Sequence, residues 1–121
     1  MSGATLLLMT SPMKRGDVWW VEFDPAIGSE IRKTRPAIIV SNNAANRNLA
    51  RVVVVPLTSN MSRQYPGEAL VTVAGKPGKA MADQIMAADK SRLKSQLGAL
   101  SKTDLLAVEE AIRLHLGMSK S

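Results

Sequence analysis

Short runs of alternating apolar and polar residues follow one another along most of the chain, a pattern typical of β-strands. Residues 17–23 are rich in aromatic and β-branched side chains, and their alternation puts Trp19, Val21 and Phe23 on one face. Residues 51–57 are apolar on both faces, which indicates a central strand, although Pro56 predicts an edge or a bulge near its end. Further strands are predicted at 37–41, 68–73, 79–86 and 97–100.

Residues 101–116 form the clearest predicted helix, because apolar side chains recur every three or four positions, at Leu105, Val108, Ile112 and Leu116. Ser101 can cap the first turn, and Gly117 fits the left-handed position that often follows a helix. Short helical turns are also expected at 44–49 and 89–93. Several short strands with one terminal helix favour a mostly β fold, a small antiparallel barrel on which the helix packs.

The chain length of 121 residues fits one domain. Met13 offers a second plausible start directly before the first predicted strand. We therefore expect residues 1–12 to form a leader outside the fold and residues 13–118 to form a single domain.

The formal net charge of +6 favours anionic partners. Residues 1–60 hold seven Lys and Arg against four Asp and Glu, and residues 61–121 hold nine against six, so each half carries +3. This even distribution indicates a basic folded surface rather than a basic tail. Charge alone leaves open a basic domain that binds no polyanion.

The absence of cysteine, the single histidine and the lack of certain motifs argue against several classes of protein. The chain has no cysteine and one histidine, His115, which excludes disulfides and a two-histidine acid–base pair within one chain and argues against a closed zinc site. No glycine-rich loop precedes a Lys-Ser or Lys-Thr pair, which argues against nucleotide hydrolysis. No apolar run approaches the length of a membrane span, so we expect a cytoplasmic protein without metal or cofactor.

Residues 28–36 concentrate charge between two predicted strands. Arg32, Lys33 and Arg35 lie within four positions, and Pro36 restricts Arg35 to an extended backbone at the mouth of the next strand. Thr58 and Ser59 follow the end of the strand at 51–57. If these strands are neighbours, their polar ends converge.

An arginine with nearby hydroxyls can hold a phosphodiester and stabilise its transition state. RNA carries its own nucleophile in the 2′-OH, so the protein need not supply one. A loop that only positions a phosphate is equally compatible with these residues. The residues by themselves therefore leave catalysis and simple binding open.

The order of short motifs from Lys14 to Met118 resembles the MazF/PemK family, the endoribonuclease toxins of type II toxin–antitoxin modules. The matching segments are Arg15-Gly16-Asp17-Val18-Trp19, Asp24-Pro25, Gly28-Ser29-Glu30, Arg35-Pro36, Val40-Ser41-Asn42, Val55-Pro56-Leu57-Thr58-Ser59, Asp83-Gln84-Ile85, Asp89-Lys90-Ser91-Arg92-Leu93 and Leu114-His115-Leu116-Gly117. Each motif is weak alone, and their order and spacing are specific together.

This resemblance implies an SH3-like barrel, a homodimer and metal-independent cleavage of single-stranded RNA at short sequences. It implies that Arg35 and Thr58 are catalytic, with 2′-OH attack leaving a 2′,3′-cyclic phosphate and a 5′-OH. The family's loop serine falls on Ser29. Residues expected to contact RNA are Ser29, Glu30, Arg32, Lys33, Ser59 and Tyr65. Trp19, Trp20 and Tyr65 could stack on bases, but we expect Trp19 in the core and Trp20 at a surface or a dimer face, so Tyr65 is the better candidate.

The expected partners are single-stranded RNA and a cognate antitoxin whose acidic, disordered segment would lie across the basic groove. The chain departs from many relatives at Met86, where they carry a basic residue. Two alternatives stay open. One is a toxin of the CcdB group that acts on DNA gyrase through protein contacts, and the other is a plain RNA-binding module.

Overall fold

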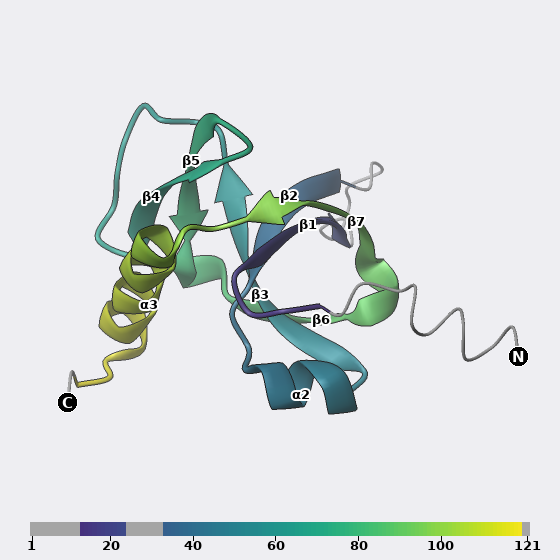
Figure 1. Ribbon diagram of the computed structural model, residues 1–121. Coiled ribbons are helices and arrows are strands. Elements are labelled where there is room, and N and C mark those ends of the chain that lie inside the picture. Colours follow the sequence, from purple (N-terminus) through teal and green to yellow (C-terminus); the bar gives the residue numbers. More distant parts are fainter. Residues whose placement is uncertain (1–12, 24–32, 120–121) are drawn as a thin grey trace, which may run out of the picture.

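The computed structural model describes residues 13–23 and 33–119, so the expectation for residues 1–12 lies outside the described residues (Figure 1). Seven strands lie in these ranges: β1 (Asp17–Phe23), β2 (Lys33–Ile39), β3 (Arg51–Thr58), β4 (Glu68–Val73), β5 (Lys76–Met81), β6 (Met86–Asp89) and β7 (Leu93–Ala99). The helices are α2 (Asn43–Asn48), α3 (Lys102–Leu116) and the 3₁₀ turns η1 (Ala82–Gln84) and η2 (Lys90–Arg92).

All strand pairs are antiparallel, in the order β4-β5-β3-β2-β1-β7, with β6 paired to β3 beside β5. The predicted class, mostly β with a C-terminal helix, is confirmed. The sheet is not a closed barrel, because no ladder joins β4 to β7 in the part of the chain that the structure describes. The Thr72 backbone N–H of β4 instead donates to Asp104 of α3 at 2.9 Å, so the helix covers this edge.

Two apolar clusters fill the two sides of the curved sheet. One includes Val18, Ile38 and Val55 and is covered by Val108 of α3, which packs against β4 (Figure 1). The other includes Trp19 and residues that alternate with the first set along β1, β2 and β3. The predicted faces of β1 are therefore correct, and Trp19 lies in the core as expected.

Several strand boundaries differ from the sequence prediction, among them that of β7, which begins at Leu93 rather than residue 97. β2 begins at Lys33 rather than residue 37, because its pairing with β1 continues through Pro36, which lies opposite Trp20. β5 begins at Lys76 and ends at Met81, where η1 interrupts the predicted strand 79–86. The helix prediction is confirmed, since Ser101 caps α3 and Gly117 takes φ 69°.

Pro56 lies in the middle of the sheet, at neither an edge nor a bulge. β3 pairs with β6 through Val54 and with β5 from Leu57 on, so Pro56 lies between its two partners on that side. The Val53 carbonyl points toward β2, where it accepts from the Val40 N–H. Backbone polar groups alternate in direction along a strand, so the Pro56 nitrogen, three positions later, points to the side of β3 away from β2. The missing donor thus falls where no ladder bond is needed.

Gly16 joins three elements through its backbone. Its N–H donates to the Ile39 carbonyl at 2.7 Å, and its carbonyl accepts from the Leu100 N–H at 2.9 Å. The φ angle of Gly16 is 94°. Beside it, the Arg15 guanidinium donates to the Val40 carbonyl and pairs with Glu109 of α3. The start of β1 is thereby tied to β2 and to the terminal helix.

We predict that Gly16→Ala lowers the free energy of unfolding by about 1–3 kcal/mol, because a side chain disfavours positive φ. The added Cβ would also lie 3.3 Å from Leu105 Cδ2. Urea denaturation measures the loss. Gly67→Ala is the matched control, since its Cβ would meet nothing closer than 3.8 Å. Equal unfolding free energies for the two variants would contradict the prediction.

Candidate functional site

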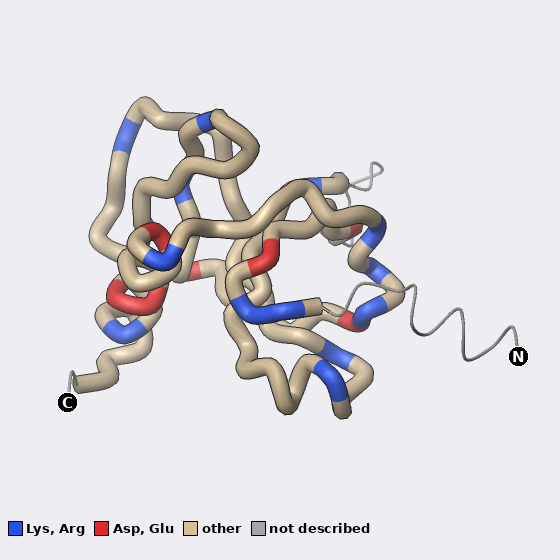
Figure 2. Tube along the Cα trace, viewed as in Figure 1, with Lys and Arg blue, Asp and Glu red and all other residues tan. Residues whose placement is uncertain are grey.

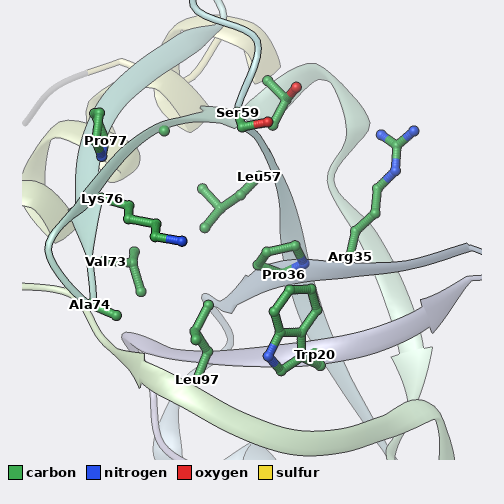
Figure 3. A pocket seen from close by; sticks show the side chains of 12 residues that line it. Trp20, Arg35, Pro36, Leu57, Ser59, Val73, Ala74, Lys76, Pro77 and Leu97 are labelled. Atoms are coloured by element: carbon green, nitrogen blue, oxygen red, sulfur yellow. The ribbon is translucent and has the colours of Figure 1, made fainter.

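A cavity of about 570 Å³ opens where β2 and β3 separate (Figure 3). All the strands except β6, together with the β4–β5 turn, contribute to its wall. The lining residues are Trp20, Arg35, Pro36, Leu57, Thr58, Ser59, Val73, Ala74, Lys76, Pro77, Gly78 and Leu97. Three of the residues singled out in the sequence, Arg35, Thr58 and Ser59, thus share one site.

The register of β2 and β3 explains why Arg35 and Thr58 lie on the same cavity. Ala37 lies opposite Pro56, and the ladder ends there. Continued two residues past the end of this ladder, the same register would set Arg35 opposite Thr58 with both side chains on one face, and both residues do line the cavity. Both residues are half-buried at the point where the strands part.

A local turn fixes the hydroxyl of Thr58. The Asn60 backbone N–H donates to Thr58 Oγ1 at 3.2 Å. The Asn60 side-chain oxygen in turn accepts from the Ser62 N–H at 3.0 Å and from its hydroxyl at 2.7 Å. Because Thr58 Oγ1 accepts a hydrogen bond, its own hydrogen remains available to donate to a bound group.

A buried ion pair supports this end of β3. Lys79 of β5 lies directly opposite Thr58 and is 4% exposed. Its Nζ is 3.2 Å from Glu68 Oε1, and the same oxygen accepts from the Tyr65 backbone N–H at 2.8 Å. The pair therefore connects β5, the strand that lies opposite Thr58, to the loop that carries Tyr65.

The charge of the cavity is positive. Arg35 and Lys76 are its charged lining residues, and no carboxylate lines it among the residues described. Lys and Arg are spread over the whole trace in Figure 2, which agrees with the basic surface expected from the sequence. In Figure 3, Lys76 points toward the middle of the cavity from the wall that faces Arg35. Such a site favours an anionic ligand.

The other predicted contact residues have separate outcomes. Ser29, Glu30 and Arg32 lie outside the described residues, and of Lys33 the structure shows the backbone, paired with Phe23. Tyr65 is exposed and does not line the cavity, and its hydroxyl is 3.4 Å from Arg63 Nη1. The role of these residues stays a prediction.

The sequence predicts no role for Lys76, and it predicts Trp20 at a surface or a dimer face, as one of the aromatic residues that could stack on a base. Both residues line the cavity. Trp20 lies opposite Pro36 across β1 and β2, and Lys76 lies opposite Val73 at the end of a hairpin. No local pattern indicates either position, because the cavity forms from strands that meet only in the folded sheet.

Within residues 13–23 and 33–119, no group of three or more His, Cys, Asp or Glu side chains is arranged to hold a metal ion. Over the same residues, no helix has the length and apolar character needed to cross a membrane.

Residues 14–116 match the family model of the PemK-like, MazF-like toxins of type II toxin–antitoxin systems. The chain belongs to this family. Endoribonuclease MazF9 of Mycobacterium tuberculosis is 40% identical over 115 residues, which cover 88% of this chain and 98% of the relative.

Solved structures agree with this membership. An endoribonuclease from a mycobacterial species superposes with a TM-score of 0.77 at 27% identity, covering 93% of this chain and 99% of that one. A mycobacterial endoribonuclease in complex with its cognate antitoxin gives a TM-score of 0.75 at 28% identity, covering 89% and 98%.

In this MazF-like chain, we predict that Glu68→Gln lowers the free energy of unfolding by about 3 kcal/mol, because it leaves the Lys79 charge buried without a carboxylate. Adding Lys79→Met to that variant should recover part of the loss, since both charges are then removed. Urea denaturation of the two single variants and the double variant measures the coupling. Strictly additive losses would show that the pair is not coupled.

Proposed function

We propose that this protein is a toxin that cleaves single-stranded RNA. The observation that carries the proposal is the cavity in which Arg35 and Thr58 lie on one face, beside Ser59 and without a lining carboxylate among the described residues. The relatives named as endoribonucleases support it. The cytoplasm is its proposed place of action.

In the proposed mechanism, the 2′-oxygen of a ribose attacks the adjacent phosphorus and the 5′-oxygen of the next nucleotide leaves. The products are a 2′,3′-cyclic phosphate and a 5′-OH. The positive guanidinium of Arg35 stabilises the negative charge of the phosphorane. The Thr58 hydroxyl donates to a phosphate oxygen and orients it.

Two proton transfers complete this step. The 2′-OH must lose a proton and the leaving oxygen must gain one. Of the described residues that line the cavity, none is a carboxylate or an imidazole. Glu30, five positions before Arg35 in the sequence, is the candidate base. The reaction needs no metal because RNA supplies the nucleophile and Arg35 the positive charge.

We predict that the purified protein cuts RNA in EDTA and that mapped ends carry a cyclic phosphate and a 5′-OH. Arg35→Ala and Thr58→Val should each lower the single-turnover rate about 100- to 1000-fold, the cost of removing one transition-state donor. The controls Arg47→Ala and Thr72→Val change exposed residues outside the cavity and should keep the wild-type rate.

Other outcomes would identify a different function. RNA that stays uncut in every sequence context counts against the proposal, and RNA that is bound but intact indicates a binding module. A fully growth-inhibitory Arg35→Ala variant would favour a toxin that acts through protein contacts, as in the CcdB group.

The antitoxin partner follows from the same site. A relative of known structure is described in complex with its cognate antitoxin. We propose that the antitoxin of this protein places an acidic, disordered segment across the cavity, where Arg35 and Lys76 supply positive charge. Such a segment would exclude RNA by occupying the site of its phosphates.

We propose that the protein is a homodimer. A second cavity, of about 420 Å³, lies beside α3, and its wall combines apolar residues with the Arg15–Glu109 ion pair, Ser41 and Arg113; the apolar ones are Val40, Val53, Ile85, Ile112 and Met118. Met86 and Leu114 add exposed apolar surface next to these residues in the sequence. These apolar side chains support an interface between two copies, in which the charged residues would lie at its rim.

Sedimentation at micromolar concentration is expected to give a mass of twice 13.0 kDa. Met118→Asp should shift the mass toward the monomer, because it places a charge in the proposed interface. Leu106→Asp is the matched control on α3, since Leu106 is 57% exposed and Met118 is 58% exposed. A wild-type monomer, or an equal effect of both variants, would contradict the proposed interface.

A further inference from the structure

The cavity has a polar end and an apolar end. Arg35, Thr58 and Ser59 provide the polar groups. Side chains of Trp20, Pro36, Leu57, Val73 and Leu97 make the apolar wall (Figure 3). At about 570 Å³ the whole space lies in the range that small-molecule sites occupy, so it can hold more than a phosphate group.

Lys76 is the charged residue on the side of the cavity away from Arg35, and it points toward the middle (Figure 3). No ion pair or side-chain hydrogen bond links Lys76 to another described residue, in contrast to Lys79, which pairs with Glu68. Its ammonium group is therefore available to a ligand.

A tight turn sets the position of Lys76. Val73 and Lys76 form the last pair of the β4–β5 hairpin, so only Ala74 and Gly75 connect the strands. Both connecting residues have positive φ, 51° and 79°, as a two-residue type I′ turn requires. Ala74 pays a steric cost for this conformation. The short turn holds Lys76 at the rim of the cavity with little freedom of the backbone.

An indole and a proline ring offer flat apolar faces on which a nucleobase can stack. A lysine ammonium donates hydrogen bonds and accepts none. It therefore pairs with O6 of guanine or O4 of uracil, and it is mismatched to the exocyclic amino group that adenine and cytosine carry at the corresponding position.

We propose that the apolar end of the cavity holds the base of a nucleotide next to the scissile phosphate and that Lys76 selects a keto base, guanine or uracil, at that position. This inference rests on the proposed function, and it assigns part of the cleavage specificity to one residue of the β4–β5 hairpin.

The test is a digest of a randomised RNA pool, with sequencing of the ends. At one fixed position beside the cut, the wild type should prefer guanine or uracil about 5- to 100-fold over adenine or cytosine. Lys76→Met should abolish that preference and leave the other positions unchanged. Lys76→Glu, which supplies an acceptor, should shift it toward adenine or cytosine. Lys102→Met, an exposed lysine on α3, should keep the wild-type profile.

A second measurement separates the two proposals. Binding of 2′-deoxy oligonucleotides, which lack the nucleophile, is measured for the wild type and Lys76→Met. If the wild type cuts RNA but Lys76→Met and Lys76→Glu leave the base profile unchanged, the Lys76 inference is wrong and the nuclease proposal stands. If the wild type does not cut RNA but binds keto bases preferentially, and this preference depends on Lys76, the nuclease proposal is wrong and the base preference assigned to Lys76 stands. If the wild type neither cuts RNA nor binds the 2′-deoxy oligonucleotides, both proposals are wrong.

Discussion

The antiparallel pairing of β2 with β3 is the interaction on which the site depends. Its register sets which residues of the two strands face one another and which side of the sheet each side chain occupies. The same alternation divides the apolar residues between two clusters and brings Arg35 and Thr58 to one face. A slip of one residue would turn the buried apolar side chains of a strand to the other face of the sheet, and Arg35 or Thr58 with them. The burial of the apolar residues therefore fixes the register, and the register fixes the positions of Arg35 and Thr58.

Beyond the last β2–β3 pair, the end of β3 is held by its pairing with β5 rather than with β2. β3 changes partner at Pro56, where the absent N–H costs no ladder bond, and then pairs with β5. This change brings the β4–β5 hairpin, with Lys76, next to the end of β2. The buried Lys79–Glu68 pair strengthens that junction. A cavity thus forms between strands that diverge while their neighbours remain tightly paired.

The environment of Arg35 favours charge stabilisation. Much of the cavity wall is apolar, which lowers the effective dielectric and strengthens the attraction between a guanidinium and a phosphate. No lining carboxylate competes for Arg35 among the described residues. The Thr58 hydroxyl is already positioned by Asn60, so the proposed hydrogen bond to a phosphate would need little rearrangement.

The sequence by itself determined the fold class, the helix α3 with its two caps, the faces of β1, and Arg35, Thr58 and Ser59 as candidates. These features depend on local periodicity, on capping residues and on motif order, which are all properties of the linear sequence. Only the tertiary structure decided that the sheet stays open, that β2 continues through Pro36, and that Trp20 and Lys76 join the cavity. The physical reason is that a cavity arises from contacts between strands distant in sequence, and neither a register nor a partner change leaves a local pattern.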